Sequence, residues 1–323
     1  MGKRHHLLAL LAACSIALPA MSQTGTGNEG EAKTIKPLNN LEVSINAGST
    51  GVGFDVSSYV HKMVRVRTGF DFMPKVKPTM NFLIEGGRYD NDGNWITTQF
   101  GEMANMLENF TGYETDDKVA MKGEPTFWNF KLLVDVFPFK NKNWHFTAGF
   151  YAGPSRVAKA YNKTEEMPSL LAVGIYNNLY DKILSGEPIY GDNVYLDPDI
   201  EDKFLGYGRM GVRVGDRVSD GTPYLMEPDK DGMVKADMKV NAFRPYLGFG
   251  YTGRIIKDDD RYNIGFECGA MIWGGTPDLI THDGTNLTKD IKNIMYSVGD
   301  YVDVVKKFKV FPVINLRITR KLF

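Results

Sequence analysis

The chain has 323 residues and is nearly neutral, with 38 Lys and Arg against 39 Asp and Glu. This balance gives no electrostatic basis for nucleic-acid binding, and a hydrophobic share of 43% is too high for a disordered chain. A mean hydropathy of −0.27 excludes a bundle of membrane-spanning helices. It is compatible with a membrane β-barrel, because the lumen and loops of such a barrel are polar.

The first 22 residues have the features of a cleavable secretory signal. Two basic residues at positions 3 and 4 precede an apolar stretch from Leu7 to Ala20, and small residues occupy the two recognition positions before residue 23. The sequence therefore predicts an exported chain with a flexible periplasmic leader over 23–40. The alternative is a lipoprotein whose mature chain begins at Cys14.

Alternation of apolar and polar residues starts at Leu41 and recurs to the C-terminus. In the segment VRVRTGFDF, Arg65, Arg67 and Asp71 face away from the valines and phenylalanines. Successive side chains of a strand point to opposite faces, so this pattern predicts a strand with one apolar side. Eight such segments occur, at 41–47, 51–58, 64–72, 127–139, 143–153, 241–255, 262–272 and 309–323.

The connections between these segments alternate in length. A tight turn near residue 49 is followed in chain order by short, long, short, long, short and long connections, the long ones lying near 87–123, 155–240 and 275–307. Small outer-membrane barrels have an even number of strands, short periplasmic turns and long external loops. If the first strand runs outward, every long insert lies outside the cell.

Two further sequence patterns, one after the third predicted strand and one within the inserts, affect the predicted fold. The alternation continues beyond residue 72 to about 86, with prolines that indicate a kink, so ten strands are the alternative to eight. Segments 168–184 and 286–308 repeat apolar residues at helical spacing. The sequence thus predicts an all-β, antiparallel, eight-stranded transmembrane barrel with long, partly helical external loops.

Several segments resemble the small outer-membrane β-barrel proteins of Bacteroidota. They are AGSTGVGFDVSSYV, VRTGFDFMP, DVFPFKNKNWHFTAGFYAG, RPYLGFGYTG and the terminal FPVINLRITRKLF. The resemblance covers strands and short turns but not the long inserts. It implies insertion into the outer membrane of a Gram-negative bacterium by the barrel-assembly machinery. Members usually have an aromatic residue two positions before the final Phe, where this chain has Lys321.

The polar faces of the predicted strands carry charges of both signs in equal number. An eight-stranded barrel is only just wide enough for side chains, so these charges are expected to form a paired network that fills the lumen. The expected network consists of Glu42, Asp55, Arg65, Arg67, Asp71, Lys131, Asp135, Arg244, Glu267 and Arg317. Trp128 and Trp144 lie near strand ends and are the predicted interface aromatics.

No catalytic constellation is evident in the mature sequence. His61 falls in a short turn, His145 on a lumen face near the periplasmic end, and His282 in the last insert without an obvious partner. The segment EPDKDG resembles a calcium loop, but Met238 stands where a bidentate Glu is needed. The sequence therefore predicts no enzyme, no metal site and no cofactor.

Three hypotheses remain for the function. The first is a non-enzymatic outer-membrane barrel with a plugged lumen, whose loops serve envelope structure, adhesion or the binding of an extracellular or envelope protein. The second is an outer-membrane enzyme acting on lipid or surface glycan. The third is a soluble periplasmic β-protein. Outer-membrane lipid is the expected partner of the barrel, and no nucleic acid is expected.

Overall fold

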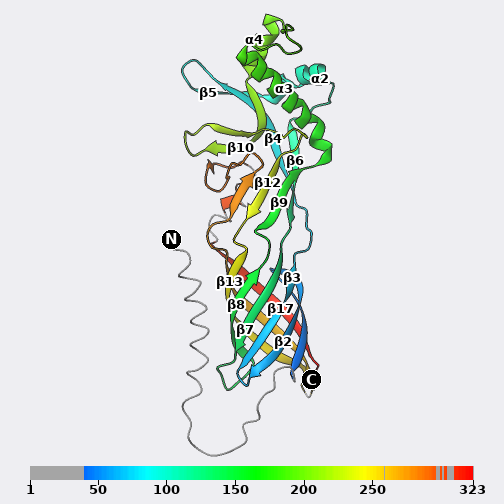
Figure 1. Ribbon diagram of the computed structural model, residues 1–323, viewed down its shortest axis with the longest axis vertical. Coiled ribbons are helices and arrows are strands. Elements are labelled where there is room, and N and C mark those ends of the chain that lie inside the picture. The colour runs from blue at the N-terminus through cyan, green and yellow to red at the C-terminus, as the bar shows by residue number, and fades with distance from the viewer. Residues whose placement is uncertain (1–39, 258, 296–298, 300–301, 304–308, 323) are drawn as a thin grey trace, which may run out of the picture. The chain divides into compact units, whose positions relative to one another are not determined.

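The computed structural model describes residues 40–322 except 258, 296–298, 300–301 and 304–308, and leaves the side chain of residue 102 undescribed. The predicted signal and residues 23–39 of the leader lie outside this range. Within it, the chain forms a closed barrel and a second, nine-stranded sheet (Figure 1).

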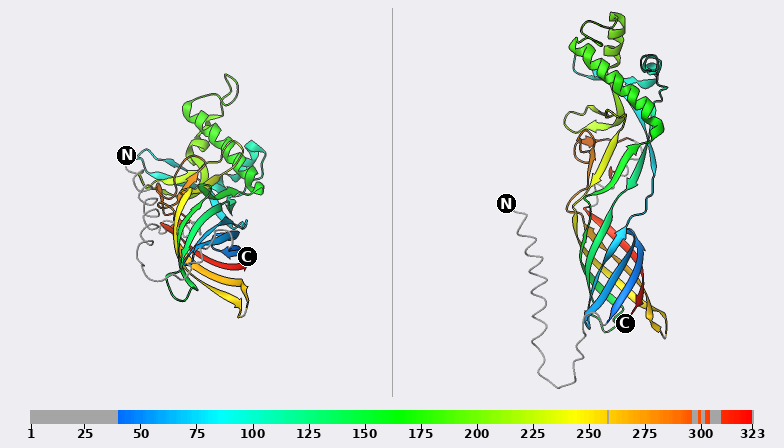
Figure 2. Two further views of the ribbon diagram at one scale, coloured as in Figure 1. Left: turned by 60° about the horizontal axis from the view of Figure 1, so that its bottom comes forward. Right: turned by 45° about the vertical axis from the view of Figure 1, so that its right-hand side comes forward.

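The barrel has eight antiparallel strands, as predicted, and not ten. They are β1 (Leu41–Gly48), β2 (Gly51–His61), β3 (Val64–Phe72), β7 (Trp128–Val136), β8 (Trp144–Ala152), β13 (Phe243–Ile256), β14 (Asp259–Ile272) and β17 (Val310–Lys321). Their order around the barrel is β1-β17-β14-β13-β8-β7-β3-β2, and pairing of β2 with β1 closes it. Figure 2 shows the slanted strands of this barrel from two further sides. Closure leaves no unpaired strand edge in the barrel.

The connections follow the predicted alternation. Strand β3 begins three residues after β2 ends, β14 begins three residues after β13 ends, and β7 is joined to β8 by residues 137–143. Because neighbouring barrel strands are antiparallel, these three short connections lie at one end of the barrel. The turn at 49–50 and the three long inserts then lie at the other end. The C-terminal strand pairs with the first strand over seven residue pairs, from Glu42–Lys321 to Gly48–Asn315.

The inserts form a second sheet that the sequence did not reveal. Its strands are β4 (Thr79–Tyr89), β5 (Trp95–Gln99), β6 (Lys118–Pro125), β9 (Arg156–Asn162), β10 (Arg209–Arg217), β11 (Pro223–Met226), β12 (Lys235–Lys239), β15 (Asp278–Thr281) and β16 (Ile291–Lys292). The order is β11-β10-β4-β6-β9-β12-β15, with β5 on β4 and β16 on β10. The proposed continuation of the third barrel strand through residue 86 was wrong, because residues 79–83 pair with β6 in this sheet. The first insert therefore begins after Phe72.

Side-chain hydrogen bonds link the two edges of this second sheet. The hydroxyl of Tyr224 on β11 lies 3.1 Å from the hydroxyl oxygen of Thr281 on β15, and it donates to Asp283 at 2.7 Å. Strands β11 and β15 stand at opposite ends of the strand order. Contact between them means that the sheet curls until its edges meet, so that its inward side chains enclose a core of their own.

The inserts carry the helices α2 (Ala104–Thr111), α3 (Met167–Ser185) and α4 (Pro198–Tyr207), with single 3-10 turns η1 (Phe100–Glu102) and η2 (Thr164–Glu166). Helix α3 confirms the helix predicted over 168–184. Its Asn177 amide donates to the Met210 carbonyl at 2.8 Å and accepts from the Met210 N–H at 2.9 Å, which fixes α3 on β10. Among the described residues, no helix is long and apolar enough to cross a bilayer.

The helix predicted over 286–308 was wrong in its first part. Residues 291–292 form strand β16, and a turn precedes it in which the Asn286 side-chain oxygen accepts from the Thr288 N–H at 3.1 Å and the Asp290 carboxylate accepts from the Asn286 N–H at 3.0 Å. Asparagine and aspartate favour such local hydrogen bonds over helix. Val302 and Asp303 are helical, but most of 296–308 lies outside the described residues.

Candidate functional site

The two faces of the barrel strands differ sharply in chemistry. Large apolar side chains on the outer face are exposed, including Ile45 at 65%, Leu247 at 62% and Ile314 at 55%. The polar side chains that alternate with them point inward and are buried. All ten residues of the expected charge network are at most 6% exposed. A barrel in water would have the opposite arrangement.

The charged layer nearest the short turns is centred on Arg65. Its Nε donates to Asp135 Oδ2 at 2.9 Å, and its Nη1 donates to Glu42 Oε2 at 3.2 Å. The guanidinium carbon also lies 5.3 Å from the ring centre of Phe137, a cation–π distance. This cation is therefore satisfied on two sides by carboxylates and on a third by an aromatic ring.

Arg67 occupies the next layer and joins three strands to β3. Its Nη2 donates to Asp135 Oδ1 on β7 at 3.1 Å and to Glu267 Oε2 on β14 at 2.5 Å. Its Nη1 lies 3.8 Å from Asp55 Oδ2 on β2. A side chain that is 1% exposed thus contacts three buried carboxylates from separate parts of the sequence.

Lys131 forms the third layer. Its ammonium group donates to Asp71 Oδ1 at 2.6 Å and lies 2.7 Å from Asp55 Oδ1. Asn46 donates to the same Asp71 oxygen at 2.8 Å, and the Thr50 hydroxyl donates to the other at 2.9 Å. Asp71 therefore has partners on both carboxylate oxygens, as a buried charge requires.

The remaining two cations differ in their partners. Arg317 Nη1 is 3.8 Å from Glu267 Oε2, a long ion pair. Arg244, near the end from which the inserts emerge, has no carboxylate partner among the described residues. It donates instead to the Asn241 carbonyl at 2.7 Å, to the Pro154 carbonyl and to the side-chain oxygen of Asn129. Carbonyl dipoles, rather than an opposite charge, compensate this guanidinium.

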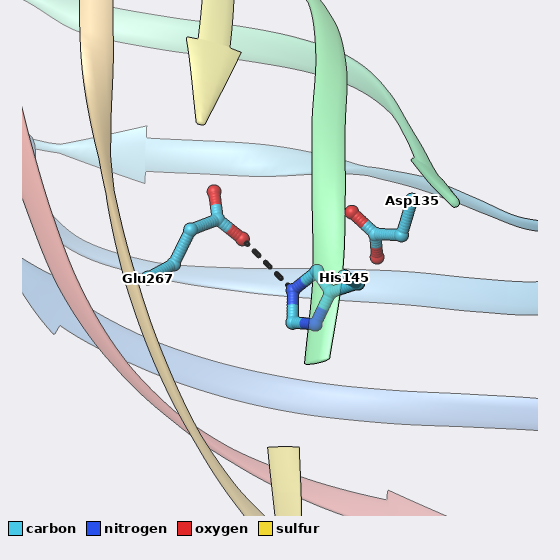
Figure 3. A group of neighbouring side chains, drawn as sticks. All are labelled: Asp135, His145 and Glu267. Atoms are coloured by element: carbon cyan, nitrogen blue, oxygen red, sulfur yellow. Dashed lines mark ion pairs between the residues drawn. The ribbon is translucent and has the colours of Figure 1, made fainter. Parts of the chain in front are cut away.

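His145 lies against the Arg67 layer and is fully buried. Its Nε2 is 3.7 Å from Glu267 Oε2, and together with Asp135 these residues bring three potential metal-ligand atoms within 4.8 Å of one another (Figure 3). Arg67 already contacts both carboxylates of this group. A divalent cation placed among them would be repelled by the guanidinium, so the geometry favours an internal ion-pair network over a metal site.

An apolar layer also crosses the lumen, and sequence reasoning missed it. It consists of Leu133, Tyr151, Tyr246, Met271 and Val313, all at most 2% exposed. The Tyr246 hydroxyl donates to Glu267 Oε1 at 2.8 Å, which links this layer to the charges. Opposed glycines make room for the ring, because a Cβ on Gly248 would lie 2.3 Å from the Tyr246 hydroxyl oxygen and one on Gly269 2.5 Å from it.

The two predicted interface tryptophans stand at opposite ends of the barrel. Each is the first residue of its strand, β7 or β8, and these strands are antiparallel neighbours. Trp128 is paired with Phe72, and Trp144 is paired with Tyr251 and stacks on Phe249 with ring centres 5.0 Å apart. Both indoles are partly exposed, at 45% and 40%. Aromatic groups thus mark both rims of the outer apolar face.

The other chemical candidates from the sequence have local structural roles. His61 accepts a hydrogen bond from the Met63 N–H in its turn, and His282 accepts one from the Lys235 N–H at 3.3 Å. In the segment that resembles a calcium loop, Asp229 accepts from the N–H groups of Asp231 and Met233 and from the Lys235 ammonium. These contacts satisfy its carboxylate within the turn.

The sequence matches no protein-family model and no curated protein. The chain resembles several solved structures. One is CarO2 of Acinetobacter baumannii, which has 14% sequence identity and a TM-score of 0.36, and the match covers 89% of this chain and 100% of that chain. CarO of the same organism has 13% identity, 90% and 99% coverage, and a TM-score of 0.37. A major outer membrane protein from Thermus thermophilus has 10% identity, 88% and 98% coverage, and a TM-score of 0.24. The resemblance to Bacteroidota proteins stays a prediction.

Proposed function

We propose that this chain is a non-enzymatic outer-membrane β-barrel with a plugged lumen, whose inserts act outside the cell. The observation that carries the proposal is the inverted chemistry of the closed barrel, with exposed apolar side chains outside and buried, compensated charges inside. Only a lipid environment removes the cost of exposing such an outer face to water. In bacteria, barrels of this kind reside in the outer membrane of Gram-negative cells.

The lumen supports a structural role rather than transport. The cations Arg65, Arg67, Lys131 and Arg244 lie inside it, and so do Tyr151 and Tyr246 of the apolar layer. Every one of these side chains is at most 2% exposed. Large buried side chains at successive heights leave no continuous aqueous path in an eight-stranded barrel.

The inserts support a role in binding or envelope structure. They form a folded sheet with a large apolar core, which includes Phe82, Met121, Val173, Tyr176 and Val212. A sheet with its own core presents a defined surface, as an adhesive or partner-binding module requires. In this proposal the partners are outer-membrane lipid at the barrel, the barrel-assembly machinery during biogenesis, and an extracellular or envelope protein at the inserts.

A conductance measurement tests the plugged lumen. We expect the purified protein to insert into planar bilayers without forming a stable ion channel at neutral pH, because the buried charges of Arg65 to Arg244 are fixed by ion pairs and hydrogen bonds. Insertion is verified independently by flotation of the protein with vesicles, and a porin inserted under the same conditions shows that channels are detectable. A reproducible open channel would mean that the lumen network is not a plug.

A further inference from the structure

The curled second sheet contains a partly open apolar cavity of about 260 Å³. Its wall includes residues of β4, β6, β9, β10, β11, β12 and β15, so that both edges of the strand order contribute to one hollow. Four methionines line it, Met80, Met121, Met226 and Met238. Unbranched, polarizable methionine side chains adapt to the shape of what they enclose, which makes them common at sites for apolar ligands.

Small residues keep this cavity open. Gly123 on β6 is directly paired with Ala160 on β9, and Ala160 is paired with Ala236 on β12, so three small residues lie side by side across three strands. All three line the cavity. The three atoms nearest to a Cβ on Gly123 would be Met80 Cε at 3.5 Å, Pro78 Cγ at 3.6 Å and the Pro78 carbonyl oxygen at 3.9 Å, all at ordinary van der Waals distances. The small residues at these three positions therefore leave space that larger side chains would occupy.

The eight-stranded barrel and the curled sheet differ in how far their inward side chains fill the interior. There, inward side chains fill the lumen to its centre, with Arg67 and Tyr246 reaching across to other strands. In the curled sheet, the inward positions at 123, 160 and 236 carry at most a methyl group. Barrels and near-barrels of seven or eight strands either fill with side chains or hold one small ligand.

We propose that this cavity binds a small, uncharged, apolar molecule. Its volume exceeds the roughly 150 Å³ apolar cavity that accepts benzene and is below the roughly 300 Å³ at which pockets for drug-sized ligands begin. The lining consists mainly of aliphatic, aromatic and thioether groups, with Thr288 and Lys159 as its polar residues, so a charged ligand would lose its hydration with little compensation. An aromatic hydrocarbon or an aliphatic molecule of similar size has the required chemistry.

Photolabelling tests the proposal. The full chain in lipid nanodiscs is irradiated with 3-trifluoromethyl-3-phenyldiazirine, a neutral aromatic probe, and labelled peptides are mapped by mass spectrometry. We expect labelling of the cavity strands 118–125 and 235–239, and its suppression by excess toluene. Labelling of barrel peptides reports exposure to lipid, whereas labelling of cavity peptides reports binding in the curled sheet. A failure of the membrane-barrel proposal can therefore be distinguished from a failure of the cavity proposal.

Variants distinguish a site from diffuse uptake of the probe. Gly123→Phe places a ring in the cavity and should abolish labelling of the cavity strands. The matched control Gly101→Phe adds the same ring at an exposed glycine whose Cβ would have no neighbour within 4 Å, and should leave labelling unchanged. If Gly123→Phe does not fold, Ala160→Leu serves the same purpose. Absence of toluene-sensitive labelling in the unmodified chain, or labelling that persists in a folded cavity-filled variant, would overturn the proposal.

Discussion

Replacing Arg67 by Ala is expected to lower the free energy of unfolding by about 3–5 kcal/mol, because it leaves buried carboxylates without their cation. Asp135 and Glu267 both accept from Arg67 Nη2, and Asp55 lies 3.8 Å from Nη1. After the substitution, Asp135 still has Arg65 and the Thr147 hydroxyl as partners. Glu267 still has the Tyr246 hydroxyl, the nearby His145 ring and a long contact with Arg317. The charge balance of the lumen is nevertheless lost.

The stability of Arg67→Ala is measured by urea titration after refolding into lipid vesicles. Arg320→Ala is the matched control, because Arg320 lies on β17 of the same barrel, is exposed, and has its guanidinium carbon 5.9 Å from the centre of the Tyr262 ring. Removing an exposed arginine of this kind should cost at most about 1 kcal/mol. Equal, small effects of the two substitutions would show that the lumen charges are hydrated.

Leu132→Arg is expected to cost about 2–4 kcal/mol in a bilayer, the penalty for a cation on the lipid face near mid-depth. Leu132 is the central residue of β7, which runs from Trp128 at one rim to Val136 near the other, and it is 37% exposed. In a water-soluble barrel this exposed position would tolerate Arg within about 0.5 kcal/mol. The substitution therefore separates the membrane hypothesis from the soluble one.

The control for Leu132→Arg is the same change at a position near the membrane interface instead of near the middle of the bilayer. Ile256 is 53% exposed and is the last residue of β13, next to the turn that leads into β14. Ile256→Arg makes the same change near the interface, where the penalty falls to about 0–1 kcal/mol. Urea titration of both variants in vesicles should show a clear difference, and a neutral Leu132→Arg would contradict a lipid-facing β7.

The barrel could be predicted from sequence because its signal is periodic. Each barrel strand alternates over nearly its whole length, and the lengths of the connections keep a strict order. The individual ion pairs could not be predicted, since alternation shows that Arg67 and Glu267 face inward but not that they meet across 200 residues of sequence. Arg244 shows the limit most clearly, because its partners include backbone carbonyls that no charge count reveals.

The second sheet escaped prediction for a physical reason. Several of its strands are short, such as β11 with four residues and β12 with five, and the strand positions that line its cavity carry alanine, glycine and methionine more often than β-branched residues. Such segments have weak β-propensity and gain their stability from pairing with distant strands. Helix α3 was predictable because its 19 residues carry a long local pattern, with Pro168 near its start.

Electrophoresis of the carbonate-washed outer-membrane fraction, with and without boiling, tests whether this chain is a closed barrel embedded in an outer membrane. We expect the protein to stay in the washed membrane and to migrate faster unheated than boiled, because the closed barrel resists detergent unfolding until heated. Recovery in the soluble periplasmic fraction, with a mobility that does not change on boiling, would contradict it.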